Sequence, residues 1–180
     1  MLVLAIPSEI GWDEGKEEFV EIEKEQTIVL EHSLVSISKW ESKWHKPFLH
    51  TSLTTEEIID YIKCMTITQN VKSTVYDRLG SDQITQITDY INDPMTATWF
   101  SDKGNRGRSR QIVTSELIYY WMISLNIPVN FEKWHLNRLL TLIRVCNEEN
   151  APKDKKNKQL SAKSRRLENE ARKKRWNTKG

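Results

Sequence analysis

The two ends of this 180-residue chain carry opposite charge, and this asymmetry limits how much of it can fold together. Residues 151–180 contain twelve Lys or Arg and three acidic residues, a net charge of +9, whereas residues 1–150 have a net charge of −7. A segment this basic and this poor in apolar residues cannot bury a hydrophobic face. We therefore expect a single compact domain followed by a basic C-terminal tail over 151–180.

The start of the domain, residues 1–32, is predicted to form a small antiparallel β-sheet packed on the body. Short runs rich in β-branched and aromatic residues occupy 2–6, 18–22 and 27–31. The stretch 8–16 contains two glycines and several acidic residues, so it is predicted to be a loop.

Residues 33–150 are predicted to form a helical body, because apolar residues there recur at three- and four-residue steps. The first helix carries Trp40 and Trp44 and ends before Pro47, and Thr54 with Glu57 forms a capping-box pattern that opens the second. Further helices are predicted over 71–79, from Ser81 or Asp82 to before Pro94, from Thr114 or Ser115 to Leu125, and over 131–146. The fold class expected is mainly α with a small N-terminal sheet, that is, α+β.

The residue types that usually carry catalysis are scattered. Neither a metal-ligand pair nor a glycine-rich phosphate loop occurs in the sequence, and the two cysteines have no paired spacing. The four histidines are far apart: His32, His45, His50 and His135. We expect a protein without enzymatic activity, cofactor or metal. The sequence also contains neither a signal peptide nor a membrane span, which predicts a cytoplasmic location.

Tryptophan supplies the first candidates for partner binding, because it is enriched in binding hot spots. Trp40 and Trp44 are four residues apart and so lie on one helical face. Both can pack in the core, or one can remain exposed as an anchor, and the spacing leaves the two interpretations open. Trp99 and Trp134 are further candidate anchors.

Two basic regions are the other candidates. The loop 102–110 carries Arg106, Arg108 and Arg110, which can grip phosphates or carboxylates or simply form a solvated connection. The tail can bind nucleic acid, dock on an acidic protein surface including this protein's own body, or act only as a solubilising segment. Its candidate binding residues are Arg165, Arg166, Arg172, Lys173, Lys174, Arg175 and Trp176.

Several segments, in order along nearly the whole body, resemble a family of tail-assembly proteins of long, non-contractile-tailed bacteriophages. These segments are LEHSLVSISKWE at 30–41, Trp44 with KPFL at 46–49, DYIKCMT at 60–66, DPMTATWF at 93–100, YYWMI at 119–123 and WHLNRLLTLI at 134–143. The resemblance implies a tail assembly chaperone acting in the host cytoplasm. Such chaperones keep the long helical tape-measure protein soluble and help the major tail-tube protein polymerise around it. The resemblance supplies no catalytic residues.

The leading hypothesis is a chaperone that binds apolar helices of the tape measure, with the tail contacting an acidic tail-tube subunit. A structural virion component, such as a connector or a tail or capsid-associated protein, is the first alternative. A nucleic-acid-binding factor acting through the basic tail is the second. Whether copies of the chain form a homo-oligomer stays open, and no membrane contact is expected.

Overall fold

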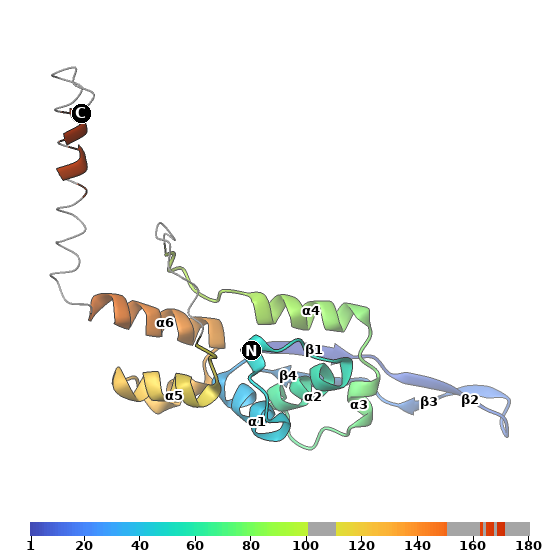
Figure 1. Ribbon diagram of the computed structural model, residues 1–180. Coiled ribbons are helices and arrows are strands. Elements are labelled where there is room, and N and C mark those ends of the chain that lie inside the picture. Colours follow the sequence, from blue (N-terminus) through green and yellow to red (C-terminus); the bar gives the residue numbers. More distant parts are fainter. Residues whose placement is uncertain (101–110, 151–162, 164, 168, 172–180) are drawn as a thin grey trace. The chain divides into compact units, whose positions relative to one another are not determined.

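The computed structural model describes residues 1–100, 111–150, 163, 165–167 and 169–171. The chain divides into two compact units, Met1–Ile143 and Arg144–Gly180. Strands come first in the first unit and helices follow (Figure 1). This is the α+β architecture expected from the sequence.

One pair of strands covers one side of the hydrophobic core. β1 (Leu2–Ile6) pairs antiparallel with β4 (Gln26–Leu30), with Leu4 opposite Ile28. Alternate side chains of a strand point to opposite faces, so one face of this pair is fully apolar and turned inward. The buried side chains on that face are Leu4, Ile6, Ile28 and Leu30. These two strands confirm the prediction to within one residue.

A second pair of strands forms a separate hairpin. β2 (Glu9–Asp13) pairs antiparallel with β3 (Glu18–Glu23), and the two extend away from β1 and β4 (Figure 1). The prediction of a loop over 8–16 is therefore wrong. Trp12 lies directly opposite Phe19, with ring centroids 5.0 Å apart, and such cross-strand aromatic pairs stabilise a hairpin.

Each of the first two long helices begins with a capping box, in which the N-cap residue and the residue three positions later exchange side-chain-to-backbone hydrogen bonds. α1 (Leu34–Trp44) starts at Ser33 and ends at His45, which adopts the left-handed conformation that closes many helices. α2 (Thr55–Met65) starts at the predicted capping box. The Glu57 amide donates to Thr54 Oγ1 (3.3 Å) and the Thr54 amide donates to Glu57 Oε2 (2.8 Å). This prediction is confirmed at atomic level.

The remaining elements differ in places from the predicted ones. The helix that follows Gly80 is capped by that glycine, whose amide donates to Gln83 Oε1 (3.2 Å), and not by Ser81 or Asp82 as predicted. The helix predicted over 71–79 shortens to a single turn. The elements are η1 (Phe48–His50), α3 (Thr74–Asp77), α4 (Ser81–Asn92), α5 (Ser115–Ser124), η2 (Val129–Lys133) and α6 (Leu136–Glu149).

The single helix predicted over 131–146 is wrong, because the chain breaks into η2 and α6. The break has a tertiary cause. Ser33 and His135 form an isolated β-bridge, and the Leu136 amide donates to the carbonyl oxygen of His32 (2.8 Å). These contacts use backbone groups that a continuous helix would need for itself.

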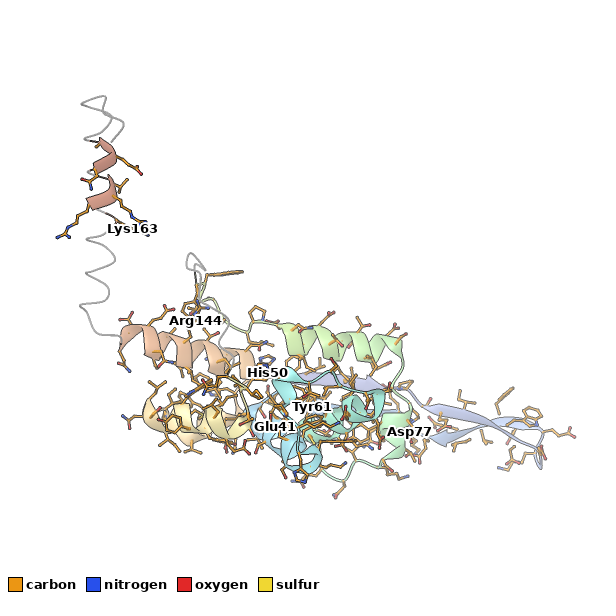
Figure 2. All side chains as sticks on the ribbon, viewed as in Figure 1. Glu41, His50, Tyr61, Asp77, Arg144 and Lys163 are labelled. Atoms are coloured by element: carbon orange, nitrogen blue, oxygen red, sulfur yellow. The ribbon has the colours of Figure 1, made fainter. Side chains whose placement is uncertain are left out.

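The core lies between the β1–β4 pair and the helices of the first unit. Its fully buried members from the helices include Leu34, Ile37, Trp40, Ile62, Met65, Ile118, Met122, Leu136 and Leu139. Glu41 and Tyr61 also lie inside this body (Figure 2). Within the described residues, no helix has the length and apolar character needed to cross a membrane.

Candidate protein-binding surfaces

Trp40 belongs to the core and presents nothing to a partner. Its side chain is 0% exposed, and its Nε1 donates a hydrogen bond to the carbonyl oxygen of Glu57 (3.0 Å). The ring packs edge-on against Phe48 with centroids 5.2 Å apart. The structure therefore corrects the suggestion that Trp40 anchors a partner, because every part of the residue already has a neighbour inside the chain.

Trp44 is half-buried, and its ring is held by a hydrogen bond and by a stacked aromatic neighbour. Its Nε1 donates to Asp60 Oδ2 (2.9 Å), and Lys43 pairs with the same carboxylate. The ring stacks against Trp40 with centroids 6.2 Å apart. Spacing alone placed both tryptophans on one face, and the structure separates them into one core residue and one at the rim of the core.

The other two tryptophans differ strongly in exposure. Trp99, which follows α4, is 90% exposed. Trp134 is half-buried, stacks on Phe131 with centroids 4.0 Å apart, and has the Arg138 guanidinium 4.1 Å from its ring centroid. Of the four predicted anchors, Trp99 alone presents most of its surface to solvent.

Most of the basic candidates fall outside the described residues. These are Arg106, Arg108 and Arg110 of the loop, and Arg172, Lys173, Lys174, Arg175 and Trp176 of the tail. Arg165 and Arg166 are described, and both are helical and exposed. Leu167 beside them is 67% exposed.

The most informative apolar surface is the outer side of α5. Tyr120 is 63% exposed and Ile123 is 70% exposed, and residues three apart on a helix are neighbours. Leu117 is half-buried at the edge of the same side. We call these three residues the α5 surface. They were not among the predicted site residues, although the run SELIYYWMIS contains a single charged residue, and this shortage of polar groups is the signal that could have found them.

A buried carboxylate fixes α5 to the rest of the body. α5 packs on α1, and its residues Ser115, Ile118 and Met122 are buried. Glu41 of α1 accepts a hydrogen bond from the Ser115 amide through Oε2 (2.7 Å) and one from the Phe48 amide through Oε1 (2.9 Å). A carboxylate at this position gives the first amide of α5 a hydrogen-bond partner. Its negative charge also interacts favourably with the positive end of the α5 dipole. α5 is thus tied to α1 at its first amide, and the α5 surface faces outward.

The hairpin presents a second apolar surface. Four large side chains of β2 and β3 are more than half exposed: Ile10 65%, Trp12 54%, Phe19 75% and Ile22 61%. Exposed apolar side chains that gather on one element are typical of interaction sites. This surface was also missed, because residues 8–16, which carry Ile10 and Trp12, were assigned to a loop, although 18–22 was predicted as a strand.

A buried polar network lies at the start of α1, away from either surface. His32 Nδ1 is 2.5 Å from Tyr61 Oη, which also lies 3.3 Å from Ser36 Oγ. The rings of His32 and His135 are 5.1 Å apart, and His135 Nε2 donates to the carbonyl oxygen of Tyr90 (2.9 Å). Burial, together with the neighbouring His135, lowers the pKa of His32 to about 3.

This network predicts a loss of stability in mild acid. The unfolded chain takes up a proton on His32 near pH 6.5, whereas the folded chain does not until about pH 3. Stability is therefore fully present above pH 6.5 and falls as the pH drops toward 3, by about 2 kcal/mol between pH 7 and pH 5. Urea unfolding at both pH values measures the difference. His32→Gln should flatten it, and an equal loss in that variant would assign it to other groups.

An open cavity of about 540 Å³ lies beside the ends of β1 and α2. Met1, Met65 and Ile67 supply apolar lining, and Lys39 and Cys64 are also at its wall. Burial raises the pKa of the Cys64 thiol, which keeps it protonated and weakly nucleophilic. No cluster of three His, Cys, Asp or Glu able to hold a metal ion occurs in the part of the chain that the structure describes. The cavity is thus suited to apolar contacts.

Similarity to characterised proteins does not identify these surfaces. Comparisons of the chain with known protein families, with curated proteins and with solved structures found no match. What the surfaces bind has to be inferred from their own shape, charge and exposure.

Proposed function

We propose that this protein is a non-enzymatic tail assembly chaperone of a bacteriophage. It binds apolar helical segments of the tape-measure protein in the host cytoplasm, and so keeps that protein soluble while the major tail-tube protein assembles around it. The family resemblance motivates the biological setting. The single observation that supports the mode of binding is the α5 surface, an exposed apolar side on a helix that packs against the body.

The chemistry of the α5 surface favours a helix as its partner. Tyr120 and Ile123 form a ridge along one side of α5, and an amphipathic helix binds by laying its apolar stripe against such a ridge. The one charged residue of α5, Glu116, lies in the first turn, so the rest of the surface makes no demand for a charged partner. Burying a side chain such as Ile123 contributes about 1.5–3 kcal/mol.

A tape-measure protein needs such a partner before its tube is built. A long helical chain with apolar stripes aggregates when those stripes stay in water. Covering them with the α5 surface of many chaperone copies would keep the chain soluble and leave each contact weak enough to release. Trp99, 90% exposed, supplies a second apolar contact in the same unit.

Substitution of the α5 surface tests this function. Ile123→Asp places a charge in the proposed contact, and we expect binding to a co-expressed tape-measure segment to weaken at least tenfold. The measurement is co-purification of the segment and its soluble fraction in cells. Ile58→Asp is the matched control, because Ile58 is also exposed (40%) but lies on α2. Equal loss in both variants, or no loss in Ile123→Asp, would contradict the assignment.

The chaperone and virion-component hypotheses separate in purified particles. A chaperone should be abundant in infected-cell lysate and absent from finished virions, as measured by quantitative mass spectrometry. A fixed copy number in the virion would instead assign the protein to the particle itself.

A further inference from the structure

The hairpin formed by β2 and β3 combines a strong negative charge with exposed apolar side chains. Residues 9–23 contain seven acidic residues and one lysine, a net charge of −6, among four exposed large apolar side chains. Glu18 and Glu21 are both exposed and lie on the strand that carries Phe19. A partner of this surface has to supply positive charge and apolar groups in one short segment.

The hairpin is held firmly at its base. Arg78 donates to the carbonyl oxygens of Pro7 (2.6 Å) and Lys24 (3.3 Å), the two points at which the chain enters and leaves the hairpin. Lys72 pairs with Glu23 (2.9 Å) at the same end. The distal part, with Trp12 and Phe19, has no such attachment among the described residues. It projects from a fixed base, as an interaction arm would (Figure 1).

The charge of the hairpin decides which partners are compatible. Two hairpins would repel each other, because each carries a net charge of −6. Nucleic acids and anionic membranes are repelled for the same reason. A basic polypeptide is attracted, and its Lys and Arg side chains can also stack on the exposed rings of Trp12 and Phe19.

The chain itself contains a segment with the required chemistry. Residues 151–180 carry a net charge of +9 and include Leu160, Leu167 and Trp176. The described part of this segment is helical, with Arg165 and Arg166 exposed beside a Leu167 that is 67% exposed. Positive and apolar groups are therefore exposed side by side in the described part of this segment.

We infer that the hairpin of one copy binds the basic tail, residues 151–180, of a second copy. The contact is heterologous, since it joins different surfaces of two identical chains, and such contacts build rings or open chains of subunits. This self-association goes beyond the proposed function, because it uses the hairpin and leaves the α5 surface free. It would bring several α5 surfaces into one assembly, which suits a very long partner.

Sedimentation velocity of the full-length chain tests the inference. We expect the weight-average mass to rise with protein concentration at about 50 mM salt and to return toward the monomer value at about 500 mM, as screening removes the attraction. Glu18→Gln with Glu21→Gln should lower the association constant on the order of threefold to tenfold. Asp82→Asn with Asp89→Asn, both exposed on α4, is the charge-matched control and should leave it unchanged.

Substitutions in the tail complete the test. Replacing Arg172, Lys173, Lys174 and Arg175 by Gln in the full chain should weaken association at least as much as the hairpin pair does. A monomer mass at every concentration and at low salt would overturn the inference. So would association that is equally strong in the hairpin pair and the wild type. Association lost only in Ile123→Asp would overturn it as well, by assigning self-contact to the α5 surface.

Discussion

Replacing Trp40 with alanine is expected to lower the free energy of unfolding by about 3–5 kcal/mol, the usual cost of removing a fully buried tryptophan. The side chain is 0% exposed, and its indole group bridges α1 and α2 through the hydrogen bond to the Glu57 carbonyl oxygen. Alanine would leave a cavity beside Phe48 and remove the hydrogen bond that the indole donates to α2. Equilibrium unfolding in urea, followed by circular dichroism, measures the change.

Two controls separate cavity and hydrogen bond from a general effect of losing tryptophan. Trp40→Phe keeps most of the ring and loses the donor, so it should cost less than the alanine variant, about 1–3 kcal/mol. Trp99→Ala removes a residue that is 90% exposed and should change stability by no more than about 0.5 kcal/mol. A Trp40→Ala loss as small as that of Trp99→Ala would show that Trp40 is not in the core.

Replacing Glu41 with alanine should cost nearly as much, about 3 kcal/mol, since hydrogen bonds to a charged group contribute about 1.5–3 kcal/mol each. Glu41 is 8% exposed, and its carboxylate accepts from the amides of Ser115 and Phe48, so both donors would lose their partner. The loss should be largest in α5, whose first amide is one of the two. Urea unfolding gives the total, and hydrogen exchange of the α5 amides gives the local part.

Variants with related chemistry define what the Glu41 result means. Glu41→Gln keeps an acceptor oxygen but no charge. It should therefore lose only about half as much free energy of unfolding as Glu41→Ala. Glu56→Ala removes an exposed carboxylate from α2 and should have little effect. If Glu41→Ala unfolded α5 no faster than wild type, this helix would owe its position to apolar packing alone.

The parts of the fold that the sequence predicts well are those governed by local chemistry. The capping box at Thr54 and Glu57 depends on two side chains three residues apart, so its signal survives in the folded chain. The break before Pro47 is similarly local. The strand over 9–13 was missed because its stability comes from the partner strand, where Phe19 meets Trp12, and not from its own composition.

Contacts between distant residues explain the other misses. The helix predicted over 131–146 is interrupted at residue 135 by hydrogen bonding to the chain around Ser33, about one hundred positions earlier in the sequence. Trp40 and Trp44 share a face by spacing, yet only the packing of η1 and α2 makes one of them core. The α5 surface was not predicted, because a helix that is apolar on all sides has no polar side to indicate which way it faces solvent.

The attachment at the base of the hairpin makes the hairpin and the body structurally independent of each other. β1 and β4 are already paired up to Ile6 and Gln26, and Arg78 ties together the two chain ends that lead outward from there. Residues 8–23 therefore form a part of the fold that contributes no residue to the pairing of β1 with β4. The hairpin can be lengthened or shortened without changing a buried hydrophobic residue of the core or a residue that pairs β1 with β4. Changes to the exposed side chains of the hairpin are consequently expected to leave the stability of the body nearly unaltered.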